Sequence, residues 1–269
     1  MTEHRGVVLR TERLTPHMVR VVVGGEGMRG FATEGLTDHY VKLVFPYEGV
    51  EYPTPFTVAN CRESVPREHW PRLRTYTVRA WDAAAKELTL DFVVHGDEGL
   101  AGPWAVAARP GDVIHMIGPG GGYAPSPEAD WHLLAGDESA LPAIAASLEA
   151  LAPGAKAYVF IEVEGPEDEQ KLDVPVTYLH RAGAPYGSRL VEVVRTLDFP
   201  EGRVHAFVHG EAAFVKELRR LLRVDRKIPL DQLSISGYWR LGVDDEGWRA
   251  VKKDWNRQVE TEESAALGA

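Results

Sequence analysis

Apolar and polar residues alternate through short runs in the first part of the chain, and Gly and Pro interrupt these runs. A period of two is typical of β-strands that bury one face. In the clearest run, Leu88, Leu90, Phe92 and Val94 would share one face. Five such runs predict strands at 17–23, 40–45, 74–81, 87–94 and 113–117. Because no helical pattern separates them, they predict a small antiparallel barrel.

The pattern changes after the Gly- and Pro-rich segment 118–127 to strands that alternate with helices. Apolar runs at 131–135, 157–163, 176–179 and 204–208 suit the buried strands of a parallel sheet. We therefore predict a barrel domain at 1–124, an α/β domain at 125–240 and a helical tail at 241–269.

Helical spacing appears between and after these apolar runs. Leu141, Ile144, Ala145 and Leu148 lie at i, i+3, i+4 and i+7, with Ser139 as the expected N-cap. A second face follows Ser188, and a third helix is expected at 211–223. Finally, Trp248, Val251, Trp255 and Val259 predict a short amphipathic C-terminal helix that packs on the rest of the chain.

Composition and charge limit the class of protein. With 269 residues, 44% of them hydrophobic, the chain is long enough for two modest domains. A net charge of −10 argues against nucleic-acid or anionic-membrane partners, so an anionic ligand needs a local basic site. The single cysteine, Cys61, excludes an intrachain disulfide framework and a four-cysteine iron–sulfur cluster. There is no signal peptide pattern and no long apolar run, so we expect a soluble, cytoplasmic protein.

The segment Arg74-Thr75-Tyr76-Thr77-Val78-Arg79 carries the most specific chemistry. In a strand, Arg74, Tyr76 and Val78 face one way, and Thr75, Thr77 and Arg79 face the other. Taken alone, these residues suit a solvated edge strand. An arginine that pairs with a diphosphate, an aromatic ring that stacks on an isoalloxazine and a hydroxyl that bonds its polar edge also make a sensible flavin site.

This motif, placed in a barrel before a nucleotide-binding domain, resembles the ferredoxin-NADP reductase superfamily. The chain resembles one family in it more closely, the siderophore-interacting proteins, which are FAD-dependent ferric-siderophore reductases of the vibriobactin-utilisation type. Eight segments look like that family's in the same order: 39–46, 74–79, 91–96, 102–105, 111–112, 130–144, 210–211 and 236–240. The resemblance implies an N-terminal antiparallel six-stranded β-barrel that binds FAD and a C-terminal α/β parallel-sheet domain that binds NADPH or NADH.

Site residues follow from the resemblance. It implies that Arg74, Tyr76 and Thr77 bind FAD, with Arg79 nearby. His95, Gly96 and a turn at Gly102, Pro103, Trp104 and Ala105 would line its ribityl and diphosphate groups, although these residues also suit an ordinary barrel turn. Lys42 resembles the family's basic contact for an anionic iron chelate, and by itself it would be a solvated lysine on an alternating strand.

The second candidate site lies between the 131–135 strand and the following helix. Parallel sheets bind ligands at the carboxyl ends of their strands, where Gly136, Asp137, Glu138 and Ser139 stand and where a helix N-terminus would offer free N–H groups to a diphosphate. Simple capping by Ser139 explains the same residues. The resemblance adds four more residues: Gly210, Glu211, Tyr238 and Trp239. Arg181, just after a predicted strand, is positioned to pair with an adenosine 2′-phosphate, or is a surface arginine.

Two departures from the family's pattern stand out. A basic residue is common where this chain has Gly120, and a small residue where it has His209. Other sites are excluded. The Gly-rich segment 118–122 lacks the Lys-Ser/Thr and the helix of a phosphate loop. His205 and His209 would lie about 13 Å apart on a strand, too far to share a metal. Hydrolase motifs are absent from the sequence.

The resemblance implies an oxidoreductase in which NADPH or NADH reduces FAD, and FAD passes single electrons to a ferric siderophore. Electron transfer through FAD requires no catalytic side chain and no metal ligand from the protein. Two alternatives stay open: a flavin reductase that serves a flavodoxin or ferredoxin, and a flavin-free siderophore-binding protein. The sequence is compatible with a monomer and leaves the choice of siderophore open.

Overall fold

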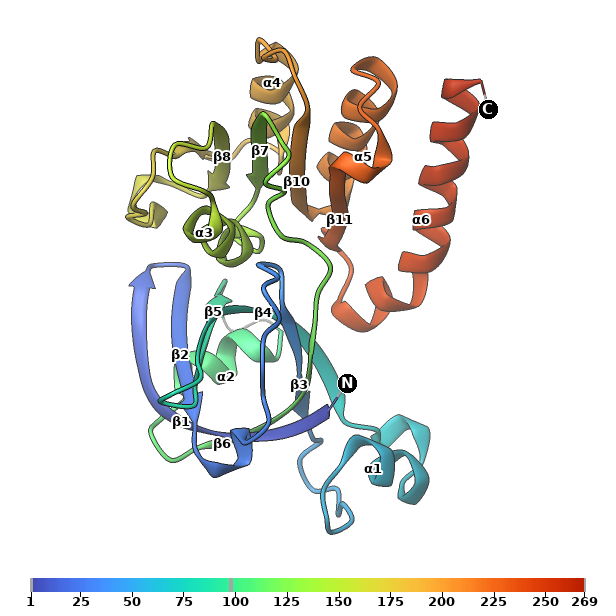
Figure 1. The fold of residues 1–269 in the computed structure, drawn as a ribbon. Helices are drawn as coiled ribbons and strands as arrows, with labels where there is room; N and C mark the ends of the chain where they lie inside the picture. Colours follow the sequence, from blue (N-terminus) through green and yellow to red (C-terminus); the bar gives the residue numbers. More distant parts are fainter. Residues whose placement is uncertain (1, 97–98, 269) are drawn as a thin grey trace. The chain divides into compact units, whose positions relative to one another are not determined.

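The computed structural model describes residues 2–96 and 99–268. The chain divides into two compact units, Met1–Gly122 and Tyr123–Ala269 (Figure 1). The boundary that we predict from the sequence, after residue 124, lies two residues beyond this division. The helical tail belongs to the second unit.

The first unit contains the antiparallel barrel expected from the alternating pattern. Its six strands close in the order β1-β2-β5-β4-β3-β6 (Figure 1). Five of them overlap the runs predicted from the sequence, and the strand missed is the first. The strands are β1 (Thr2–Thr15), β2 (Met18–Gly24), β3 (Tyr40–Phe45), β4 (Arg72–Asp82), β5 (Glu87–Val93) and β6 (Val113–Gly120).

The missed strand β1 pairs with both β2 and β6 and so closes the barrel. Its inward positions include His4, Gly6 and Val8, all buried. A histidine and a glycine at core positions hide the alternation of apolar residues that identifies a strand. The barrel core includes the predicted inward face of β5, with Leu88, Leu90 and Phe92 fully buried.

The barrel also contains two helices that the sequence pattern does not predict. These are α1 (Val58–Ser64), whose N-cap Thr57 accepts a hydrogen bond from the amide of Asn60, and α2 (Ala101–Ala107). Each has seven residues, too few for a clear helical period. The turn predicted at Gly102 to Ala105 is therefore wrong, because these residues form the first turns of α2.

The second unit contains a five-stranded parallel sheet in the order β11-β10-β7-β8-β9. Four strands match the predicted apolar runs, and β11 is an addition. The strands are β7 (Trp131–Gly136), β8 (Ala157–Val163), β9 (Thr177–His180), β10 (Val204–Glu211) and β11 (Leu233–Trp239). The predicted combination of an antiparallel barrel and a parallel-sheet domain is thus confirmed.

Helices cover both faces of this sheet (Figure 1). On one face, α3 (Leu141–Ala150) packs Ile144 and Leu148 against Leu134 of β7. On the other face lie α4 (Ser188–Thr196) and α5 (Ala212–Arg220), with Leu190 of α4 and Leu218 of α5 among the core residues. The N-cap expected at Ser139 is wrong: Ala140 holds that position, and the hydroxyl of Ser139 bonds Asp137. In α4, Gly187 is the N-cap and Ser188 is the first helical residue.

The C-terminal helix α6 (Asp245–Leu267) is longer than the sequence predicts. Trp248 and Val259 are buried as expected, whereas Val251 is exposed. Glu263 near its end pairs with Arg219 and Arg223, at 2.6 and 2.8 Å. Among the described residues, we find no helix with the length and apolar character needed to span a bilayer.

Candidate functional site

The flavin motif lies on β4, where the register fixes which way each side chain faces. Arg74 is opposite Leu43, and Tyr76 is opposite Val41, both of which are fully buried core residues. Paired residues in antiparallel strands point to the same face. Arg74 and Tyr76 therefore share the inward face, and Thr75 and Thr77 the opposite one, as the predicted alternation requires.

A β-bulge changes this pattern at Arg79. Val78 pairs with Leu90, but Ala80 pairs with Thr89, so Arg79 is the extra residue on β4. A bulge turns the following side chains toward the other face. For this reason Trp81, three positions after the buried Val78, packs on the barrel core. The regular alternation that would place Arg79 on the face opposite Tyr76 is therefore interrupted at Arg79.

Aromatic rings connect two of the predicted FAD-binding residues. The half-buried ring of Tyr76 lies 4.2 Å from the ring of Phe92, and Phe92 lies 5.6 Å from Trp104 of α2, both measured between centroids. Trp104 in turn contacts Phe45 at 6.0 Å. Phe92, which the sequence places only in a core face, therefore joins β4 to α2 and anchors Tyr76 from within the barrel.

The other residues predicted to bind FAD lie nearer the surface. His95 and Gly96 are exposed directly after β5, and Gly102 and Pro103 are half-buried in α2, whereas Ala105 is buried. The guanidinium of Arg74 donates to the carbonyl of Leu73 at 3.0 Å. A cation, an anchored half-buried aromatic ring and a hydroxyl on one strand fit the diphosphate and the planar ring of FAD.

Lys42 and Gly120 are the residues that the sequence connects with the iron chelate. Lys42 is half-buried and lies opposite Thr75, on the outward face of β3. At Gly120, an added Cβ would lie only 2.6 Å from Cζ of Tyr40. The ring of Tyr40 thus occupies the space that a side chain at position 120 would need.

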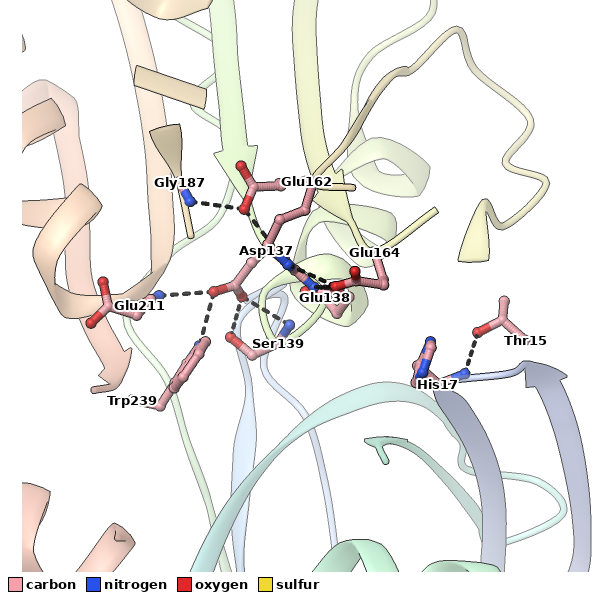
Figure 2. Close-up of polar contacts among 11 residues, drawn as sticks. Thr15, His17, Asp137, Glu138, Ser139, Glu162, Glu164, Gly187, Glu211 and Trp239 are labelled. Carbon is pink, nitrogen blue, oxygen red and sulfur yellow. Dashed lines mark hydrogen bonds and ion pairs between the residues drawn. The ribbon is translucent and has the colours of Figure 1, made fainter. Parts of the chain in front are cut away.

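A polar cluster around Asp137 joins three strands at their carboxyl ends (Figure 2). The buried Asp137 carboxylate accepts hydrogen bonds from the amide and hydroxyl of Ser139 at 2.9 and 2.5 Å. It also accepts from the amide of Glu211 and from Nε1 of Trp239, each at 2.8 Å. Burial, followed by the charge of Glu138, raises the pKa of Asp137 to about 6, against these four donors. Asp137 therefore ties β7 to β10 and β11.

The backbone amides at the start of α3, which are expected from the sequence to be free, donate hydrogen bonds within this cluster. The amides of Ala140 and Leu141 donate to the carbonyl of Asp137, that of Ser139 donates to its side chain, and residue 142 is a proline. The expectation that this helix start offers free N–H groups to a diphosphate is wrong for these residues. Capping within the chain satisfies them instead.

Glycines let the strand ends approach closely. A Cβ on Gly136 would lie 2.6 Å from the carbonyl oxygen of His209, and one on Gly210, whose φ is +142°, would lie 2.6 Å from Oδ2 of Asp137. Both positions thus serve the packing of the protein itself. Glu211 is the N-cap of α5, accepting from the amide of Ala213 at 2.6 Å.

Arg181 lies in a second cluster, which Glu138 joins to the first. Each of its three guanidinium nitrogens contacts a different carboxylate: Nη2 lies 2.8 Å from Glu138, Nη1 lies 3.3 Å from Glu162, and Nε lies 3.0 Å from Glu164. The ring of Tyr186 covers its face at 4.0 Å. Arg181 is only 5% exposed, so it is not the surface arginine considered from the sequence, and a 2′-phosphate would have to compete with three carboxylates for it.

Electrostatics agree with this geometry. Burial acts to lower the pKa of Arg181, but hydrogen bonding and charge from Glu138 outweigh it and raise the pKa. Burial raises the pKa of Glu162, even though the amide of Gly187 and the Arg181 guanidinium oppose the shift. The Arg181 cluster thus carries one buried cation against three carboxyl groups, of which Glu164 is partly exposed.

His209, one of the two departures, is buried between aromatic rings. Its ring stacks on Phe207 at 3.9 Å and tilts against Tyr238 at 4.7 Å, while Nε2 lies 3.0 Å from the Ser234 hydroxyl. Burial, then the charge of Lys252, lowers the pKa of His209 to about 3. It is therefore neutral at neutral pH. Among the described residues, no group of three metal-ligating side chains occurs.

The structure brings most predicted residues of the second domain together and adds others. Trp239 contacts Tyr186 at 5.0 Å, which links the Asp137 cluster to the Arg181 cluster. Sequence reasoning missed Glu162, Glu164 and Tyr186. A signal was present for the first two, because two glutamates at i and i+2 close an otherwise apolar buried strand.

A closed barrel with a flavin motif, followed by a parallel-sheet domain with a polar cluster at the carboxyl ends of its strands, defines a flavoprotein oxidoreductase with the ferredoxin-NADP reductase fold. Residues 7–123 match the family model of the siderophore-interacting FAD-binding domain, and residues 129–242 match that of the siderophore-interacting protein. The chain therefore belongs to the siderophore-interacting protein family. The barrel domain is therefore an FAD-binding domain.

Several relatives carry names that describe an activity. The chain is 34% identical to the ferric vibriobactin reductase ViuB of Vibrio cholerae, over 89% of this chain and 90% of that one. It is 30% identical to the NADPH-dependent ferric-chelate reductase of Escherichia coli, over 86% and 91%. An uncharacterized protein of Mycobacterium tuberculosis is 46% identical, over 93% and 95%.

Solved structures support the same fold. A siderophore utilization protein from T. fusca has a TM-score of 0.79 and 38% identity, covering 91% of this chain and 95% of that one. A ferredoxin NADP+ reductase from Neisseria gonorrhoeae, with FAD and NADP bound, has a TM-score of 0.62 at 14% identity and covers 89% and 100%. The second likeness concerns the fold alone.

Proposed function

We propose that the protein uses NADH or NADPH and bound FAD to reduce the ferric iron of a siderophore, releasing Fe(II) in the cytoplasm. The observation that carries the proposal is the arrangement of Arg74, Tyr76 and Thr77 on β4, inside the barrel that matches the family's FAD-binding domain. The names of the Vibrio cholerae and Escherichia coli relatives support the choice of substrate.

The barrel residues divide the work of holding the cofactor. Arg74 supplies the cation for the diphosphate, Tyr76 supplies an aromatic ring that Phe92 holds in place, and Thr77 supplies a hydroxyl. His95, Gly96, Arg79 and the α2 residues from Gly102 to Ala105 belong to the same proposed site. In the second domain, the residues around Asp137 and Arg181 receive the pyridine nucleotide.

The electron balance determines what the protein must do. One NAD(P)H gives up two electrons as a hydride and so reduces two ferric ions to two ferrous ions, with one proton released. FAD supplies the conversion from two-electron to one-electron transfer. A siderophore's hard oxygen ligands hold Fe(II) less well than Fe(III), so reduction favours release. No side chain has to bind the iron, and Lys42 supplies positive charge for an anionic chelate.

Anaerobic stopped-flow mixing tests this proposal. Protein reduced with NADH or NADPH is mixed with a ferric siderophore or with oxidised flavodoxin. The flavin absorbance at about 450 nm reports reoxidation, and a ferrous chelator reports Fe(II). We expect rapid reoxidation by the siderophore with stoichiometric Fe(II). Reoxidation by flavodoxin alone would favour a flavin reductase for a protein acceptor. A colourless protein that cannot be reconstituted with FAD would favour a siderophore carrier.

A further inference from the structure

The carboxyl end of β8 carries an unusual set of charges for a site that would accept a phosphate. Glu162 ends a buried strand and is completely buried, and Glu164 follows two positions later. Glu138 approaches from the loop after β7 (Figure 2). In doubly wound sheets this region receives the adenosine ribose, where an acidic residue bonds the 2′-hydroxyl of NAD and an arginine accommodates the 2′-phosphate of NADP.

The arginine of this region is already engaged. Arg181 contacts Glu138, Glu162 and Glu164 at once, and its side chain is 6% exposed. With all four groups ionised, one positive and three negative charges leave the cluster with a net charge of −2. The cation that the sequence suggested for a 2′-phosphate is thus neutralised and surrounded by acceptors.

The three carboxylates differ in how far a ligand can reach them. The side chain of Glu162 is 0% exposed; its Oε1 accepts from the Gly187 amide at 2.8 Å, and its buried Oε2 has no hydrogen-bond partner among the described residues. The side chain of Glu138 is 11% exposed, and that of Glu164 is 45% exposed. Glu164 is therefore the carboxylate of the cluster that a bound ribose can contact.

Two pyridine nucleotides differ in what they offer to such a group. A ribose diol donates hydrogen bonds that a carboxylate accepts, whereas a 2′-phosphate brings about two negative charges next to it. We propose that the Glu138, Glu162, Glu164 and Arg181 cluster makes NADH the preferred reductant of this protein, with Glu164 as the residue that discriminates against the 2′-phosphate. The inference rests on the proposed function and decides between its two nucleotides. In this respect the chain differs from its Escherichia coli relative, whose name states dependence on NADPH.

Steady-state and binding measurements on the FAD-loaded protein test the inference. We expect kcat/KM for NADH with ferric siderophore to exceed that for NADPH at least ~10-fold, because charge repulsion in a partly buried site is only weakly screened. Glu164→Gln should reduce this ratio several-fold, mainly by lowering KM for NADPH. Glu192→Gln, an exposed glutamate on α4, makes the same change in net charge and should leave the ratio unchanged.

Calorimetry separates the failure of this inference from the failure of the proposed function. NAD+ and NADP+ are titrated into wild type and into Glu164→Gln, which needs no siderophore. If wild type binds NAD+ more tightly than NADP+, and if Glu164→Gln reduces this difference, the result supports the cluster's role even if no siderophore is reduced. Equal or tighter binding of NADP+ to wild type, an unchanged ratio in Glu164→Gln, or no binding of either nucleotide would overturn the inference.

Discussion

The two candidate binding regions of this chain carry opposite charge. On the barrel, Arg74 and Arg79 lie on β4, with Lys42 on the neighbouring strand. At the carboxyl end of the parallel sheet, two adjoining clusters hold five acidic side chains and one arginine: Asp137 and Glu211 in the first, and Glu138, Glu162 and Glu164 around Arg181 in the second. A protein of net charge −10 can therefore still hold an anionic cofactor, because local charge and not net charge determines the site.

The regions also differ in how deeply they lie. Arg74, Tyr76 and Thr77 are half-buried, whereas Asp137, Glu211 and Arg181 are buried and bond one another or their neighbours. A polar group that is buried costs free energy when its partner is removed, and one at the surface does not. Substitutions in the sheet cluster should therefore change stability, and substitutions on β4 should change cofactor affinity.

The largest effect on stability is expected for Arg181→Met. Removing the guanidinium leaves Glu162 buried and unpaired, which typically costs about 3–5 kcal/mol. We expect this loss in the free energy of unfolding of the second domain, measured with urea and tryptophan fluorescence.

Two variants sharpen this prediction. Adding Glu162→Gln to Arg181→Met should restore part of the loss, since the buried charge is then gone. Arg195→Met removes an ion pair with Glu217 whose partners are 57% and 52% exposed, and should cost at most about 1 kcal/mol. Equal costs for Arg181→Met and Arg195→Met would show that the buried Arg181 cluster contributes no more to stability than an exposed ion pair.

On the barrel, Arg74→Ala is expected to weaken FAD binding without unfolding the domain. A hydrogen bond to a charged group contributes about 1.5–3 kcal/mol, which corresponds to a loss in affinity of ~10–100-fold. Titration of the deflavinated protein with FAD measures it. Arg10→Ala is the control, because Arg10 lies on β1 with its side chain 58% exposed and paired with Glu87. Stoichiometric FAD and wild-type turnover in Arg74→Ala would refute the assignment of the motif.

How far the sequence predicts this molecule depends on the range of the interaction. The alternation of Leu88, Leu90 and Phe92 is local, and it correctly places a strand and its buried face. The helix α2 is short, and its position depends on Trp104 packing against Phe92, a contact between two elements.

The same limit applies to the site. Gly136 and Glu138 can be found as a strand end facing a helix, but Arg181 follows β9 and its partners come from the ends of β7 and β8, which only the folded sheet brings together. Spacing places Arg181 after a strand and does not show which charges surround it. For this reason its pairing with a 2′-phosphate could be suggested from the sequence, whereas its three carboxylate neighbours could not.

A smaller effect on the free energy of unfolding is expected from two buried groups of the sheet domain, His209 and Asp137. Their contributions change with pH in opposite directions. His209 has a pKa of about 3 in the folded protein and about 6.5 when unfolded, so the unfolded state binds more protons between these values and stability falls as pH drops below about 6.5. Asp137, with a folded pKa of about 6 and an unfolded value of 3.8, acts in the opposite sense, and stability falls as pH rises from 3.8 to about 6.

His209→Gln tests this contrast. The glutamine cannot take up a proton, so the loss of stability between about pH 7 and pH 5 should be smaller in the variant by about 1–2 kcal/mol. Urea unfolding at both pH values measures the difference, and the pH dependence is informative whatever the stability of the variant at pH 7. An identical pH dependence in wild type and variant would mean that His209 titrates normally in the folded protein.

The smallest effect is expected for Ser139→Ala, which removes one of four donors to the buried Asp137 carboxylate, the hydroxyl at 2.5 Å. Losing one hydrogen bond typically costs about 0.5–1.5 kcal/mol. Because that bond lowers the pKa of Asp137, its removal should raise the pKa further, and the cost should therefore be smallest below about pH 6 and grow as pH rises above about 6. FAD affinity should stay unchanged, since Ser139 lies in the other domain. A cost that does not vary with pH would mean that Asp137 does not titrate between about pH 4 and pH 8, contrary to the raised pKa on which this prediction rests.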